Sequence, residues 1–67
     1  MHAGKLDEAE AIFLECLARA DQMDVDYLRA ESYVCLSYVA MRRGDATAQR
    51  AMLLQARQAY ERDQTTS

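Results

Sequence analysis

The sequence predicts an all-α protein of three helices, arranged as antiparallel helical hairpins in one domain over residues 1–67. The chain has no proline and only two glycines, too few chain-reversing residues for the hairpins of a β-sheet. Its apolar residues recur at spacings of three and four, as on one face of a helix. Hydrophobic residues make up 51% of the chain and charged residues 28%, which is typical of a packed chain rather than a disordered one.

A first helix is expected over residues 5–20. Acidic residues occur early in this segment, where the positive end of the helix dipole favours them. We expect Gly4 to form a turn before the helix, and the acidic stretch over residues 20–26 to end it. The apolar residues form one stripe, as in an amphipathic helix. The stripe consists of Leu6, Ala9, Ile12, Phe13, Cys16, Leu17 and Ala20.

A second helix is expected over residues 26–43, with Asp24 or Asp26 as its N-cap. Two arginines followed by Gly44 form a stop signal at its end, because cations and a glycine both favour a helix C-terminus. The helix is apolar on two sides and should therefore be the central one. One face has Ala30, Tyr33, Leu36, Ser37 and Ala40, and the other has Val34, Tyr38 and Met41.

A third helix is expected over residues 46–62, with Asp45 as its N-cap. The last residues, 63–67, are polar and should fray. One face of this helix is apolar and rich in alanine. It consists of Ala48, Met52, Ala56, Ala59 and Tyr60, with Leu53 beside it.

The chain contains an internal repeat with a period of 40 residues. A glycine, a small residue, a bulky trio and a second small residue recur in register, and we interpret them as one structural unit used twice. The matched positions are Gly4 with Gly44, Ala11 with Ala51, the trio Ile12, Phe13 and Leu14 with Met52, Leu53 and Leu54, and Cys16 with Ala56.

These residues resemble the tetratricopeptide repeat, whose helical hairpins stack into a right-handed α-solenoid. In that family the second helix of a hairpin carries small, large and small residues, and the first carries an aromatic, a leucine and a small residue before a glycine turn. The resemblance covers residues 4–62, about one and a half repeats. The matching positions are Ala9, Phe13, Cys16, Tyr33, Leu36, Ser37, Gly44, Leu53 and Ala56.

The sequence departs from the family pattern at Gln49 and Ala40, and it lacks the terminal proline. Its period is 40 residues where the family norm is about 34. The longer period is similar to repeats of bacterial regulators, kinesin light chains and peptide-sensing proteins.

The resemblance implies a surface that binds a protein or peptide. The first helix of each repeat in the family lines a groove for extended or helical peptides, and here that helix is the second one. Carried over to this sequence, the groove-facing residues are Glu31, Val34, Tyr38, Met41 and Arg42. The alternative is that the apolar members of this set are core or oligomer contacts. In both cases another polypeptide covers the face.

The resemblance also implies that Gly4 is the turn of a repeat whose first helix is missing. The stripe through Phe13 and Leu17 would then face an upstream helix as well as Tyr33 and Leu36 downstream. Either the chain is a piece of a longer repeat protein, or a second copy supplies the missing surface. We expect a homo-oligomer in solution in both cases, with Phe13 and Leu17 on the self-association face.

No arrangement of residues typical of catalysis occurs, and we expect no enzymatic activity, cofactor or metal ion. His2 is the one histidine and lies at a terminus. Ser32 and Ser37 lack a histidine or lysine partner in the pattern, and helix capping explains the closely spaced Asp24 and Asp26.

The two cysteines, Cys16 and Cys35, fall inside apolar helical patterns, 19 positions apart. We expect them to be buried, reduced residues of the core rather than a disulfide or a metal site.

Charge and hydropathy argue against two classes of partner. The net charge is −3 and the basic residues are scattered, so we expect no nucleic-acid binding. The longest apolar run, residues 33–41, is far shorter than the roughly 20 residues of a membrane helix. The N-terminus has no signal-peptide pattern, and a cytoplasmic location is expected.

The leading functional hypothesis is a protein–protein interaction module, a tetratricopeptide-like scaffold that binds a partner segment or its own copies. A second hypothesis is a ligand- or peptide-sensing fragment of a bacterial regulatory protein. A third is a small chaperone or adaptor for a secreted subunit. A DNA-binding or ATPase segment in the same gene would favour the second, and co-purification with a small, aggregation-prone protein would favour the third.

Overall fold

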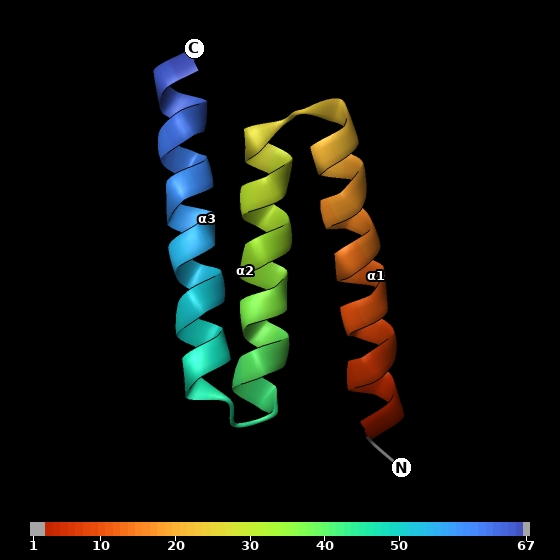
Figure 1. Ribbon diagram of the computed structural model, residues 1–67. Coiled ribbons are helices and arrows are strands. Elements are labelled where there is room, and N and C mark those ends of the chain that lie inside the picture. The colour runs from red at the N-terminus through yellow and green to blue at the C-terminus, as the bar shows by residue number, and fades with distance from the viewer. Residues whose placement is uncertain (1–2, 67) are drawn as a thin grey trace.

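The computed structural model describes residues 3–66 and consists of three α-helices. They are α1 (Ala3–Met23), α2 (Asp26–Arg42) and α3 (Ala46–Thr66). Successive helices run antiparallel, and α2 lies between the other two (Figure 1). The predicted all-α class and its helical hairpins are confirmed, and the central place of the second helix is confirmed with them.

The three helices form a single layer. α1 and α3 both pack against α2, and within residues 3–66 the backbones of α1 and α3 do not come within 8 Å of each other, Cα to Cα. The layer measures 44 × 22 × 11 Å, so its thickness is about that of one helix. Ordinary domains bury their core between two or more layers of secondary structure. Both broad faces of this chain are therefore open.

The core is small and dominated by alanine. Ala30 of α2 and Ala59 of α3 are fully buried, which requires the two helices to approach closely. Val39 is the largest fully buried side chain. The remaining buried apolar residues are Ala20, Leu36, Ala40 and Ala56.

Two serines of α2, Ser32 and Ser37, are also buried. Their hydroxyl groups donate to the backbone carbonyls of Leu28 and Val34, so the polar atoms are satisfied inside the helix itself.

The α1–α2 and α2–α3 connections use the same backbone motif. Asp24 has φ 56° and Gly44 has φ 76°, both in the left-handed region. The amides after them, of Val25 and Asp45, donate to carbonyls five residues back, at 3.1 and 2.9 Å. This is the Schellman ending of a helix, which satisfies carbonyls at the helix terminus.

Of the two predicted helix N-caps, one is confirmed and the other is wrong. Asp45 caps α3 as predicted, since its carboxylate accepts from the amide of Ala48 at 3.0 Å. The predicted cap of α2 was wrong: Val25 is the N-cap residue and provides no side-chain bond. Asp24 instead closes α1, and Asp26 is the first residue of α2.

Two helix boundaries also differ from the predictions. Gly4 is not a turn, because α1 begins at Ala3 and runs through it. A glycine without a positive φ can join a helix at a modest entropic cost, and its neighbours favour the helix. α3 continues to Thr66 instead of fraying after residue 62, and the hydroxyl of Thr65 donates to the carbonyl of Arg62 within this last turn. His2 and Ser67 lie outside the described residues.

Candidate protein-interaction surface

The predicted groove-facing residues of α2 all lie on its exposed surface, and we refer to them as the α2 face. Val34 is 40% exposed, Tyr38 50% and Met41 46%, so the alternative that they belong to the core of this chain is wrong. They follow one another at intervals of three and four residues, which places them on one side of the helix. The α2 face consists of Glu31, Val34, Tyr38, Met41 and Arg42.

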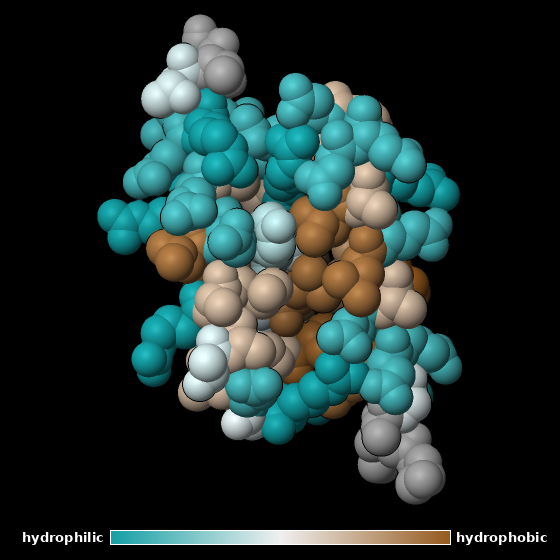
Figure 2. Space-filling model, viewed as in Figure 1, coloured by the Kyte–Doolittle hydropathy of each residue, from teal (hydrophilic) through white to brown (hydrophobic). Residues whose placement is uncertain are grey.

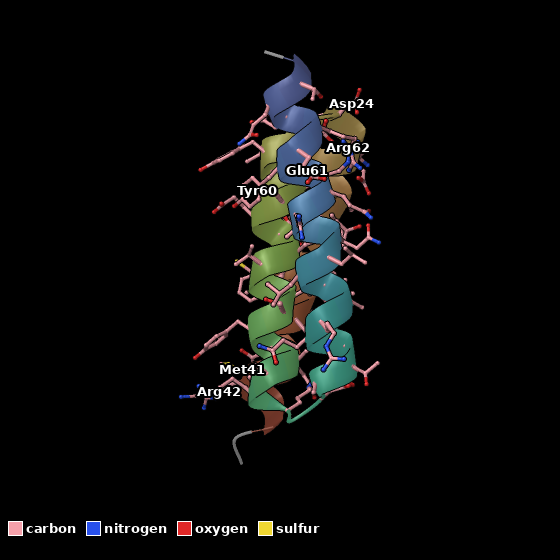
Figure 3. All side chains as sticks on the ribbon, turned by 90° about the vertical axis from the view of Figure 1, so that its left-hand side faces the viewer. Asp24, Met41, Arg42, Tyr60, Glu61 and Arg62 are labelled. Carbon is pink, nitrogen blue, oxygen red and sulfur yellow. The ribbon has the colours of Figure 1, made fainter. Side chains whose placement is uncertain are left out.

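Polar contacts hold the two ends of the α2 face. Arg42 donates to the hydroxyl of Tyr38 at 2.9 Å, and its guanidinium lies 5.8 Å from the centre of the tyrosine ring. Glu31 accepts a hydrogen bond from the hydroxyl of Tyr60 on α3. In Figure 3, Met41 and Arg42 project to one side of α2. The apolar middle of the face is thus framed by positioned polar groups.

The Tyr60–Glu31 contact links α3 to the α2 face. The hydrogen bond to Glu31, together with burial, raises the pKa of Tyr60 to about 12. The ring of Tyr60 also packs edge-on against Tyr27, with 6.3 Å between ring centres. Glu31 is therefore held from the α3 side.

A groove of about 380 Å³ runs between α1 and α2, beside the α2 face. We call it the α1–α2 groove. Its apolar side chains on α1 are strongly exposed, since Ile12 is 58% and Met23 63% accessible. Arg19 on the α1 wall and Glu31 on the α2 wall supply its charges. The remaining lining residues are Phe13, Cys16, Ala20, Leu28, Ser32 and Cys35.

The two predicted self-association residues have different surroundings. Phe13 lines the α1–α2 groove, and Leu17 does not. Both side chains are half-buried. The exposed stripe of α1 instead runs along Ile12, Cys16 and Met23, one step around the helix.

The cysteine predictions were partly wrong. Both cysteines are free thiols, but Cys16 is exposed and Cys35 is half-buried. Cys16 is uncovered because α3 lies on the other side of α2 and does not reach α1. Burial, together with the nearby charge of Glu31, raises the pKa of the Cys35 thiol above its usual range.

Hydrophobic side chains reach the surface over the middle of the layer, and polar side chains cover its two ends. Figure 2 shows this distribution on the broad face opposite the α2 face, because Met41 and Arg42 project from the side that is turned away in that view (Figure 3). An exposed apolar area bordered by polar groups is typical of a surface that contacts another macromolecule.

Sequence reasoning missed a cluster of ion pairs at the α1–α2 connection. Arg29 donates to Asp21 at 2.5 Å, to Asp24 at 2.9 Å and to Asp26 at 2.8 Å, and Arg62 of α3 reaches Asp26 at 3.2 Å. This cluster ties the end of α1, the start of α2 and the last third of α3 together. Figure 3 shows Asp24 and Arg62 near each other on the side opposite Met41 and Arg42.

The pKa of Asp26 reflects this cluster. Burial alone would raise it, but the hydrogen bonds from Arg62 and Arg29 outweigh burial and hold it below the usual aspartate range. The closely spaced aspartates, taken together with Arg29 one turn later, are the sequence signal that could have indicated this cluster.

A second cluster pairs the far ends of α1 and α2. Arg43 donates to Asp7 and pairs with Glu10 at 3.1 Å, and the hydrogen bond to Glu10 raises the pKa of the guanidinium. The sequence predicted Arg43 only as a helix-ending cation. Its structural partners are 36 and 33 residues away, and no local pattern reveals them.

Within residues 3–66, no group of three or more histidine, cysteine or acidic side chains is placed to hold a metal ion. The same residues include no helix with the length and hydropathy needed to cross a membrane.

Comparisons with known proteins provide no relatives for this chain. No protein-family model matches it. Neither the curated proteins nor the solved structures contain a significant match. Its function is therefore argued from its own surface.

Proposed function

We propose that this chain is a protein–protein interaction module that binds polypeptide on the α2 face. The observation that carries the proposal is the exposure of Val34, Tyr38 and Met41 in a row on the central helix of a one-layer fold. A tyrosine, a flexible methionine and an arginine are residue types enriched where proteins bind one another.

The chemistry of the face suits an amphipathic polypeptide. The apolar middle takes aliphatic or aromatic side chains, and Glu31 and Arg42 at its ends offer opposite charges that fix the direction of a bound segment. The proposal includes the tetratricopeptide-like character of the scaffold and its cytoplasmic location, both expected from the sequence.

The test uses random 16-residue peptides displayed on phage and selected against the intact chain. Tyr38→Ala and Met41→Ala are each expected to weaken binding of the selected peptides by about tenfold or more, because truncation of a central contact residue costs more than about 1 kcal/mol. Leu54→Ala is the matched control, since Leu54 on α3 is 53% exposed but lies outside the α2 face.

Dissociation constants are measured by fluorescence anisotropy, and circular dichroism verifies that each variant keeps its helices. Peptides that bind both α2-face variants as tightly as the wild type would refute the proposal. A selection that yields no peptide would refute it if the chain is also monomeric, because the α2 face would then be free and still bind nothing.

A further inference from the structure

The exposed stripes of α1 and α2 are complementary in chemistry and in level, by which we mean the distance of a residue along its helix from the α1–α2 connection. The α1 stripe is Ile12, Cys16, Arg19 and Met23, which all line the α1–α2 groove. The α2 stripe is Tyr27, Glu31, Val34 and Tyr38, at the same spacing of three and four residues. All eight residues are exposed, and Glu31 belongs to both the groove and the α2 face.

The two stripes match because α1 and α2 form an antiparallel hairpin. α1 ends at Met23 and α2 begins at Asp26. At about 1.5 Å per residue, Arg19 and Glu31 each lie about 6–8 Å from the connection. Ile12 and Tyr38 likewise both lie about 16–18 Å from it.

The remaining stripe residues follow the same rule, so that Cys16 is level with Val34 and Met23 with Tyr27. Three levels pair apolar or aromatic side chains, and the fourth pairs an arginine with a glutamate.

We propose that a second copy of this chain covers the α1–α2 groove, related to the first by a two-fold axis that runs along the groove. Rotation about that axis keeps every residue at its level and exchanges the two walls. α1 of one copy then lies on the α2 face of the other. Arg19 meets the partner subunit's Glu31, and Ile12 meets the partner subunit's Tyr38. A closed two-fold contact of this kind uses the same surface on both copies.

The charges favour a second copy because the surface is complementary to itself. Each copy offers one positive and one negative group on opposite walls of the groove, and the rotation pairs them twice. The arginine side chain is 72% exposed, and within residues 3–66 its one ion pair is with Glu15 on the same helix, at 3.1 Å. Such exposed pairs contribute little to the fold, so Arg19 is available to a partner at small cost.

The exposed area also fits a dimer. The chain exposes 4905 Å², whereas a compact monomer of 7.6 kDa exposes about 4,300 Å². The excess is about 600 Å² per chain, and a contact that covers it on both copies buries about 1,200 Å², the lower end of the range for specific interfaces. A second copy also supplies the second layer that the fold lacks.

The dimer rests on the proposed function, because it names α1 of a second copy as the polypeptide that the α2 face binds. The two can fail separately. A chain that stays monomeric but binds selected peptides through Tyr38 would overturn the dimer alone. A chain that does neither would overturn both.

The test is a charge exchange measured by sedimentation equilibrium of the full chain. Arg19→Glu and Glu31→Arg are each expected to raise the dimer dissociation constant about tenfold or more, because each places like charges opposite one another at two symmetric positions. The double variant R19E/E31R restores opposite charges and is expected to return the constant to within a few-fold of the wild type.

Three further variants keep the test decisive. Tyr60→Phe removes the hydroxyl that Glu31 accepts from, so it measures how much of any Glu31→Arg effect comes from that lost bond. Ile12→Asp is expected to abolish the dimer, and Leu54→Asp, at a similarly exposed residue of α3, should leave it intact.

The proposal is overturned if the wild type sediments as a monomer up to millimolar concentration. It is equally overturned if the dimer tolerates Ile12→Asp. A double variant R19E/E31R that stays weaker than the wild type by more than Tyr60→Phe alone weakens the dimer would also overturn it.

Discussion

Gly44 is the residue on which the α2–α3 turn depends. Its φ of 76° is in the left-handed region, and the space around its Cα is open, so a methyl group there would meet backbone strain but no neighbouring atom. Gly4 is equally open but lies inside α1 without a positive φ. The same substitution at the two glycines should therefore act in opposite directions.

We predict that Gly44→Ala lowers the free energy of unfolding by about 1–2 kcal/mol, because alanine is strained in the left-handed region. Gly4→Ala should raise it by up to about 1 kcal/mol, since alanine loses less entropy in a helix. Urea unfolding of the two variants checks both signs. A destabilising Gly4→Ala would mean that Gly4 forms the turn that its alignment with Gly44 predicts.

Tyr60 makes the stability of the chain sensitive to alkaline pH. Its pKa rises from the ordinary value of 10.0 to about 12 in the folded state, first because its hydroxyl donates to Glu31. The fold thus favours the neutral phenol. The contribution of Tyr60 to the free energy of unfolding is complete below pH 10 and is lost as the pH rises through about 12.

We predict that the urea midpoint of the wild type falls between pH 10 and pH 12 by more than that of Tyr60→Phe, and that the variant lacks the tyrosine ionisation near pH 12 seen by absorbance at 295 nm. Tyr33→Phe serves as the control for loss of a hydroxyl in general. Equal pH dependence in wild type and Tyr60→Phe would contradict the role given to the Glu31 contact.

At the residue scale, the sequence predicted features whose cause is local. Asp45 was recognisable as a cap because its partner amide is three residues away, and Gly44 because glycine suits a left-handed helix ending. Asp24 takes the same conformation without being a glycine, and Arg29 stabilises it from five residues further on. A rule based on glycine alone could not find that ending.

The contact between α2 and α3 depends on small side chains. Ala30 and Ala59 are fully buried, and Ala56 is 2% exposed. A larger side chain at any of these positions would push the helices apart, because packed interiors leave no room for added methylene groups.

We predict that Ala59→Leu lowers the free energy of unfolding by about 1–3 kcal/mol through overpacking. Ala51→Leu is the matched control, since Ala51 is an exposed alanine of the same helix. It should change stability by less than about 0.5 kcal/mol. The two are compared by urea unfolding with circular dichroism, and equal effects would mean that α2 and α3 do not meet at Ala59.

At the element scale, periodicity gave the number of helices, their order and the central position of α2. The helix ends were less predictable. Polarity over residues 63–67 indicated fraying, but α3 continues to Thr66. Arg62, one turn before that end, pairs with Asp26 of the neighbouring helix. Such stabilisation comes from contacts between elements distant in sequence, which spacing along one helix does not reveal.

The whole molecule is one layer thick, and this shape has the largest consequence for function. The α2 face was predicted from a family resemblance for which the comparisons with known proteins gave no match, yet its residues do lie exposed in a row. The α1–α2 groove was not predicted as a site, because it exists only when two helices whose centres are 21 residues apart, at positions 13 and 34, lie side by side. Its match to the α2 face follows from the hairpin geometry.

The central claim is that a second layer covers this open face, and small-angle X-ray scattering of the wild-type chain over a concentration series tests it most directly. Two copies stacked over the α1–α2 groove should give twice the 7.6 kDa mass of one chain, while the longest dimension stays close to the 44 Å of the single layer. A mass of one chain at every concentration would contradict the claim. So would a dimer markedly longer than the single layer, which would place the contact at an end of the molecule and leave the face open.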